Sequence, residues 1–142
     1  MNNDRFKFRG KRQGYNNWIY GSLIVLPNNN FGIVQDNDIS ENDNGDAFDF
    51  SYAPVVAGTV GQCTGLSAVK SYRGVKPEDL LIFEGDVIEH KSIDGEWTEW
   101  IVQFNASYGR WQANNKNEIY DITVSLFSVS EIIGNIHESE GK

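Results

Sequence analysis

The sequence has very few of the residues that build disulfides or zinc sites. Its 142 residues include one cysteine, Cys63, so no disulfide can form within the chain. The two histidines, His90 and His137, are far apart, whereas a zinc site usually takes three or four ligands at characteristic spacings. Neither a metal nor another cofactor is therefore expected. Cys63 follows small and apolar residues, which predicts buried packing rather than a reactive thiolate.

The sequence also lacks segments that would carry it into or through a membrane. The apolar run at 23–26 stops at Pro27, far short of the roughly 20 residues that span a bilayer. The basic stretch at 5–12 is not followed by an apolar segment, as a secretory signal would require. A cytoplasmic protein with no membrane association is expected, because its cysteine use suits a reducing compartment.

Extended runs of helix-forming residues are absent as well, while aromatic residues are plentiful. The chain has eight Phe, six Tyr and four Trp, and such rings bury large apolar areas. Fourteen Gly and many Asn tolerate the positive φ angles of tight turns. The composition predicts a mainly-β fold with a few short helical turns. Its antiparallel strands are expected to form a small barrel-like sheet, which removes exposed edges.

Local patterns predict where the strands lie. Residues 18–26 and 31–34 flank a Pro-Asn-Asn-Asn turn and should form a hairpin. A second hairpin is expected between 87–93 and 97–104, through a two-residue Asp-Gly turn. Further strands are expected at 55–64, 124–129 and 132–136, and a single helical turn at 76–80.

Residues 35–49 form the least core-like segment, with six carboxylates and no basic residue. Taking Gly45 as the sixth position of a calcium loop places Ser40 first and Ser51 last, so both essential carboxylates are missing. The segment is expected to be an exposed acidic loop that binds calcium no better than about millimolar.

The motif Glu84-Gly85-Asp86 allows two interpretations. Its two carboxylates could serve as a catalytic acid and base. Alternatively, Gly85 adopts a positive φ in a tight turn while Asp86 accepts hydrogen bonds from nearby backbone N–H groups. The turn chemistry favours the second interpretation, so no catalytic residue is assigned.

Positive charge is concentrated at the N-terminus of a chain whose formal net charge is −8. Five of the twelve basic residues and one of the twenty acidic residues lie in 1–12, which leaves a charge of −12 in 13–142. That acidic remainder should repel polyphosphates, so nucleic-acid binding is expected to be weak at most. In an extended N-terminal strand, Phe6 and Phe8 would face a core while Lys7 and Arg9 stay in solvent. The candidate binding surface comprises Lys7, Arg9, Lys11, Arg12, Trp18 and Tyr20.

Taken in order, several segments resemble the YopX family of phage and prophage proteins. They are Phe8-Arg9-Gly10-Lys11, Trp18-Ile19-Tyr20-Gly21-Ser22-Leu23, Thr59-Val60-Gly61-Gln62, Thr64-Gly65-Leu66, Ile82-Phe83-Glu84-Gly85-Asp86-Val87 and Glu131-Ile132-Ile133-Gly134-Asn135-Ile136-His137-Glu138. The resemblance runs over nearly the whole chain and implies one domain, 1–142, with or without a small C-terminal subdomain. It implies a mostly-β structure with barrel character and a bacterial host that carries phage-derived DNA. The family has no established activity, so the resemblance transfers no catalytic residues.

Three hypotheses for function follow. The first is a non-enzymatic phage or prophage accessory protein that binds another protein, of the host or of the phage, and self-association into a homo-oligomer stays open. The alternative is a nucleic-acid-associated module that uses the basic N-terminal strand. An enzyme ranks last, because no catalytic constellation is recognisable.

Overall fold

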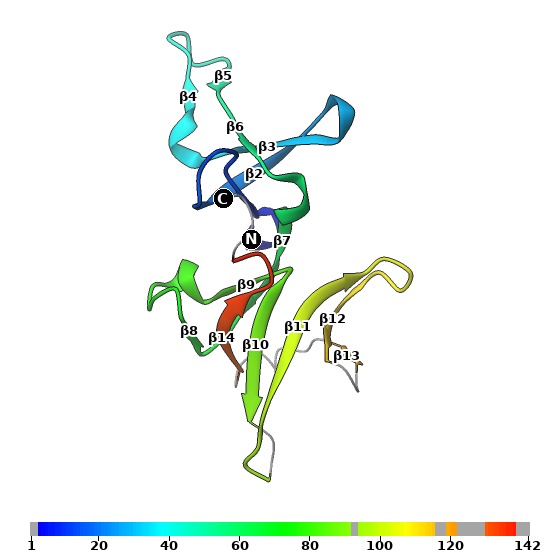
Figure 1. The fold of residues 1–142 in the computed structure, drawn as a ribbon. Helices are drawn as coiled ribbons and strands as arrows, with labels where there is room; N and C mark the ends of the chain where they lie inside the picture. Colours follow the sequence, from blue (N-terminus) through cyan, green and yellow to red (C-terminus); the bar gives the residue numbers. More distant parts are fainter. Residues whose placement is uncertain (1–2, 92–93, 116–118, 122–129, 139–142) are drawn as a thin grey trace. The chain divides into compact units, whose positions relative to one another are not determined.

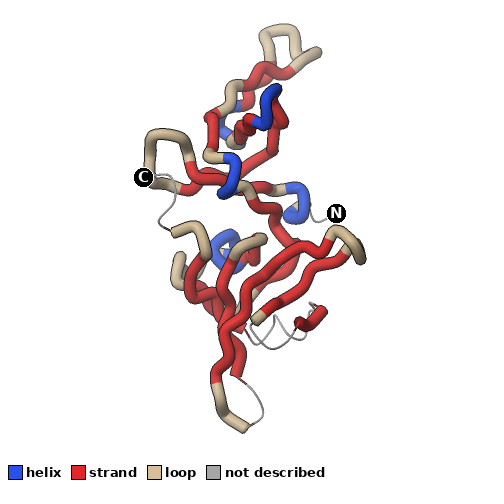
Figure 2. Tube along the Cα trace, turned by 45° about the vertical axis from the view of Figure 1, so that its right-hand side comes forward, coloured by secondary structure: helices blue, strands red, loops and turns tan. Residues whose placement is uncertain are grey.

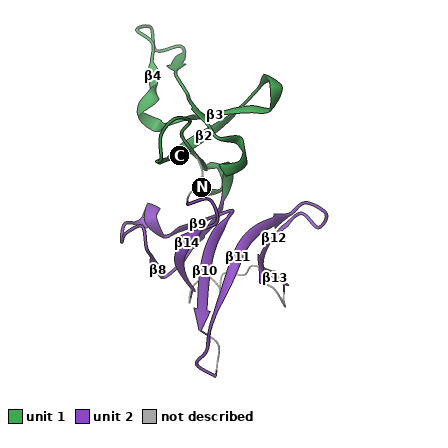
Figure 3. Ribbon diagram, in the orientation of Figure 1, with its two compact units in different colours: residues 1, 3–62, 139–142 green, residues 2, 63–138 purple. Residues whose placement is uncertain are grey.

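The computed structural model describes residues 3–91, 94–115, 119–121 and 130–138. Strands dominate, and the helical segments are short 3₁₀ turns (Figure 2), which confirms the mainly-β prediction. The strand expected at 124–129 lies outside the described residues. The chain divides into two compact units, and within the described part unit 1 comprises Asn3–Gln62 and unit 2 comprises Cys63–Glu138 (Figure 3).

Unit 1 is built on an antiparallel sheet with the strand order β6-β3-β2-β1, which the first residues of β7 continue. The predicted hairpin is present: β2 and β3 pair, and the turn between them contains Asn28 and Asn29 at positive φ (61° and 59°) (Figure 1). The core of the unit consists of Ile19, Ile33, Ala53 and Val55. The elements are η1 (Asp4–Phe6), β1 (Phe8–Lys11), β2 (Trp18–Leu26), η2 (Pro27–Asn29), β3 (Asn30–Val34), β6 (Ala53–Val55), η4 (Ala57–Thr59) and β7 (Gly61–Ser67).

The single strand predicted at 55–64 is wrong, because η4 interrupts it between β6 and β7. Thr59 holds this turn from two sides. Its hydroxyl donates a hydrogen bond to the carbonyl of Val56 (2.6 Å) and accepts one from the backbone N–H of Lys11 (2.9 Å). Lys11 is 48 residues away in sequence, so local propensity could not reveal the interruption.

The acidic segment 35–49 is largely exposed, but it is not an irregular loop. After η3 (Asp36–Asp38), strands β4 (Ile39–Glu41) and β5 (Phe48–Phe50) pair as an antiparallel hairpin, drawn at the top of Figure 1. Together they make a separate sheet of two strands. The segment therefore carries its own backbone pairing.

Unit 2 contains a six-stranded sheet with the order β13-β12-β11-β10-β14-β8. All pairs are antiparallel except that of β14 with β8. The later residues of β7 pair with β9. The buried core consists of Ala68, Ile82, Ile88, Trp100, Val102, Ala113 and Ile132. The elements are β8 (Lys70–Ser71), η5 (Pro77–Leu80), β9 (Leu81–Phe83), β10 (Asp86–Lys91), β11 (Trp97–Asn105), β12 (Arg110–Asn114), β13 (Ile119–Asp121) and β14 (Ser130–Asn135).

The predicted hairpin of β10 and β11 is present, with Lys91 opposite Trp97 at its last described pair. Gly95 adopts the positive φ of 89° that a tight turn requires. Residues 92–93 lie outside the described residues, so the predicted two-residue form of the turn stays a prediction. The helical turn expected at 76–80 is confirmed as η5, with Pro77 at its start.

Among the described residues, no sheet closes on itself, so the barrel prediction is wrong. Closure requires the first and last strands of one sheet to pair. The strands are instead shared between two units, each with its own core, and the terminal strands of each sheet remain edges.

Candidate protein-interaction surface

The basic N-terminal strand is buried where the sequence predicted exposure. Arg9 is 1% exposed and Lys11 is 2% exposed, while Phe6, expected in a core, is 54% exposed. The prediction that Arg9 stays in solvent is wrong, because β1 is a central strand between β2 and β7. Of the two phenylalanines expected to face a core, Phe6 and Phe8, only Phe8 packs against the core of unit 1.

The register of β1 with β2 brings four of the six candidate residues to one face. Arg9 lies opposite Tyr20 and Lys11 lies opposite Trp18, and residues paired across antiparallel strands share a face. The guanidinium carbon of Arg9 lies 4.6 Å from the centre of the Trp18 ring, and Lys11 Nζ lies 5.5 Å from it. These cation–π contacts hold both charges inside the unit.

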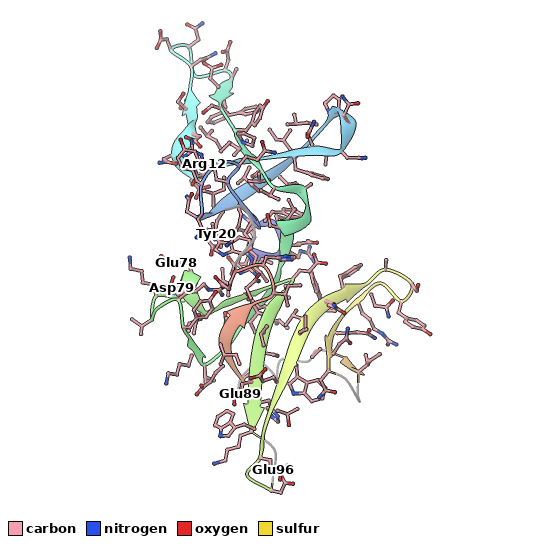
Figure 4. All side chains as sticks on the ribbon, viewed as in Figure 1. Arg12, Tyr20, Glu78, Asp79, Glu89 and Glu96 are labelled. Atoms are coloured by element: carbon pink, nitrogen blue, oxygen red, sulfur yellow. The ribbon has the colours of Figure 1, made fainter. Side chains whose placement is uncertain are left out.

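The remaining candidates lie elsewhere in unit 1. Lys7 and Arg12 are half-buried, and Arg12 stacks on the ring of Tyr15 at 4.5 Å from its centre. Arg12 and Tyr20, both in unit 1, are labelled in Figure 4. Three cations of the candidate surface, Arg9, Lys11 and Arg12, therefore stack on aromatic rings. Two of them, Arg9 and Lys11, are inaccessible.

The motif Glu84-Gly85-Asp86 has the geometry of a tight turn in which Asp86 accepts hydrogen bonds, not that of a catalytic pair. Gly85 adopts a φ of 87°. The Asp86 carboxylate, fully buried, accepts hydrogen bonds from the backbone N–H of Phe83 (2.8 Å) and from Asn135 Nδ2 (3.3 Å). It also pairs with Arg73 Nη1 at 3.3 Å. Cys63 is 1% exposed, which confirms its predicted burial.

Within the part of the chain that the structure describes, no group of three or more His, Cys, Asp or Glu side chains is arranged to hold a metal. Nor does any described helix have the length and apolar character needed to cross a membrane. The predicted weakness of calcium binding by 35–49 stays a prediction.

The sequence interpretation missed an apolar surface on the acidic hairpin. The register places Ile39 opposite Phe50 and Glu41 opposite Phe48, so Ile39, Phe48 and Phe50 share one face of the β4–β5 sheet. They are 41%, 67% and 60% exposed. We call these three side chains the apolar hairpin face. The alternation Phe48-Asp49-Phe50, inside an otherwise acidic segment, was the signal that could have revealed it.

The hairpin is well defined at both of its ends. At the tip, the N–H of Asn42 donates to the carbonyl of Ala47 (2.9 Å), and Asn42 Nδ2 donates to Asp46 Oδ1 (2.8 Å). At the base, the N–H of Ser51 donates to the carbonyl of Asp38 (3.2 Å). These bonds fix the two strands, so the apolar hairpin face is a structured surface.

The charge around this surface has one sign. No Lys or Arg occurs from residue 13 to residue 69, and the six carboxylates of that stretch all lie in 36–49. The hairpin therefore joins three exposed apolar side chains to a purely acidic surrounding sequence. Such a surface suits a partner with both apolar and basic groups.

Comparison with known proteins identifies the family. A family model described as YopX protein matches residues 7–141. No curated protein and no solved structure matches the chain. The match covers nearly the whole sequence, and the chain belongs to the YopX protein family.

Proposed function

We propose that this YopX-family chain is a non-enzymatic accessory protein of phage or prophage origin that binds another protein through the apolar hairpin face. The observation that carries the proposal is the exposure of Ile39, Phe48 and Phe50 together on one face of a structured hairpin. Large aromatic side chains contribute most to protein–protein binding when a partner covers them. Unit 1 has a separate core that contains none of the three, so these side chains are not needed to fill that core.

The nucleic-acid alternative ranks behind this proposal for a structural reason. Phosphate contacts need accessible cations, and Arg9 and Lys11 are buried against Trp18. Of the basic candidates, Lys7 and Arg12 retain partial exposure. The acidic hairpin in the same unit opposes any polyanion.

The proposal is tested by capture of a partner from bacterial host extract with the tagged full-length chain. Three proteins are compared: the unaltered chain, the double variant Phe48→Ser with Phe50→Ser, and Val25→Ser. Val25 is a matched control, because it is 70% exposed on β2 of the same unit but lies outside the hairpin. Circular dichroism verifies that all three fold alike.

The expected result is a host or phage protein that the unaltered chain and Val25→Ser enrich equally and that the double variant loses. Crosslinking with mass spectrometry should place the contact at the hairpin. Enrichment that the double variant retains in full would contradict the proposal, as would a crosslink pattern confined to unit 2.

A further inference from the structure

We infer that the hairpin receives an extended basic segment of its partner, which adds as a third strand along the outer edge of β5. This inference rests on the proposed function and specifies how the partner binds and what chemistry it presents. It follows from the backbone directions of the hairpin, from its apolar face and from its charge.

The backbone bonds of the hairpin determine which groups point outward. Asn42 bonds to Ala47 and Ser51 bonds to Asp38 across the two strands. In an antiparallel ladder, hydrogen-bonded pairs of residues alternate with non-bonded pairs. Phe48 lies opposite Glu41 and Phe50 lies opposite Ile39. By this alternation, both of these pairs are non-bonded. The N–H and C=O groups of Phe48 and Phe50 therefore point away from β4, toward the outer edge of β5.

The two edges of the hairpin are not equivalent. On the β4 side, the outward N–H of Ile39 already donates to the carbonyl of Asp36 in η3. On the β5 side, the described residues contribute no third strand to this sheet. An unpaired edge is a template for strand addition, in which main-chain bonds provide affinity and alternate side chains provide specificity. The β5 edge is thus the docking edge.

The side chains of the docked segment follow from the two faces of the hairpin. A strand added at β5 would lie about 4.8 Å from it, with alternate side chains beside Phe48 and Phe50. Those positions require apolar groups. The intervening positions would lie on the face of Asp49 and Ser40 and require Lys or Arg. The inferred occupant is a protein segment in which apolar and basic residues alternate.

Charge also separates this occupant from a second copy of the chain. The whole chain carries a net charge of −8, and two of its five N-terminal cations are buried in unit 1. A second copy would bring further acidic surface to an acidic hairpin. A basic segment of a different protein complements the negative charge of the hairpin. Dimer formation through the same edge is therefore treated as a result that would contradict the inference.

The probe is a fluorescein-labelled octapeptide that alternates Lys and Val, titrated into the full-length chain by fluorescence anisotropy at low salt and at about 0.15 M salt. A Glu–Val peptide of the same pattern tests the charge. Two further Lys–Val peptides are N-methylated, one at every Val and the other at every Lys. In a strand, the N–H groups of alternate residues point to opposite edges. Either the Val or the Lys N–H groups of the docked peptide therefore face β5, and only the peptide methylated at that set should lose binding.

Four results are expected. The Lys–Val peptide binds and the Glu–Val peptide does not. Phe48→Ser with Phe50→Ser weakens binding on the order of tenfold or more, while Val25→Ser leaves it unchanged. Replacement of Glu41, Asp43, Asp46 and Asp49 by the corresponding amides weakens binding and flattens its salt dependence. In ¹⁵N-labelled protein, peptide addition shifts the amide signals of β5 more than those of β2.

Several results would overturn the inference. Equal binding of both N-methylated peptides would show attraction by charge without strand pairing. Equal binding of the Glu–Val peptide would remove the charge argument. A Phe48- and Phe50-dependent dimer in analytical ultracentrifugation would make a second copy the occupant. If the peptides fail while the hairpin still captures a host protein, the proposed function stands and this inference falls.

Discussion

At the scale of single residues, Asp86 is the buried charge on which the Glu-Gly-Asp turn depends. Its carboxylate, with no exposed surface, pairs with Arg73 and accepts from Phe83 N–H and Asn135. Replacing Asp86 by Ala leaves those donors without their acceptor, so we expect a loss of about 3 kcal/mol of unfolding free energy. Urea denaturation measures it. The control is Glu78→Ala on exposed η5, which should change stability by less than about 0.5 kcal/mol. An equal effect of both variants would contradict this role of Asp86.

Tyr72 provides a second prediction at the residue scale. Tyr72 is 48% exposed, so its burial is only partial. This partial burial and the hydrogen bond that its hydroxyl donates to Glu138 raise its pKa above the ordinary value of 10.0. A pKa that is higher in the folded chain means that the folded state holds the proton longer than the unfolded state does. The resulting stability is complete below about pH 10 and is lost as pH rises above it.

Thermal unfolding at pH 8 to 11 tests this effect. Tyr72→Phe should show a smaller alkaline loss of stability than the unaltered chain, because it has no proton to release. Tyr108→Phe is the matched control for loss of a tyrosine hydroxyl at a more exposed site, since Tyr108 is 69% exposed. Identical pH profiles of Tyr72→Phe and the unaltered chain would exclude the contribution of Tyr72.

At the scale of the elements, Gly21 permits the close approach of β2 to β3. A Cβ at this position would lie 2.0 Å from the carbonyl oxygen of Val34, a distance that forces the backbones apart. Gly21→Ala should therefore lower the unfolding free energy by at least about 2 kcal/mol. Gly58→Ala is the matched control within unit 1, because a Cβ there meets nothing within 4 Å. Thermal denaturation of both variants measures the difference, and a Gly21→Ala protein as stable as Gly58→Ala would refute this explanation.

At the scale of the whole molecule, charge predicts little affinity for nucleic acid. Residues 3–62 carry five basic and seven acidic side chains, and 63–138 carry six and twelve, so each unit is acidic. We expect a dissociation constant no tighter than about 10 µM for double-stranded oligonucleotides at ~0.15 M salt. Anisotropy titration at two salt concentrations measures it, and Lys7→Gln with Arg12→Gln should weaken what remains. Submicromolar, salt-tolerant binding would return the nucleic-acid hypothesis to first place.

Sequence by itself determined the features that depend on neighbouring residues. The hairpins β2–β3 and β10–β11, the Pro77 turn and the turn at Gly85 are all encoded within short stretches. Strand alternation and the φ preferences of Pro, Gly and Asn act locally, which is why these elements could be predicted.

Tertiary structure alone decided the features that depend on distant pairings. Arg9 is buried because Gly61 of β7 pairs beside it and Trp18 stacks upon it, and neither contact has a local signal. The division into two units replaced the expected barrel in the same way. Likewise, only the folded structure shows that Phe48 and Phe50 stay exposed and that Ile39 of β4 joins them on one face. Alternation predicts that two side chains share a face, but only the packing of the rest of the chain determines whether that face is covered.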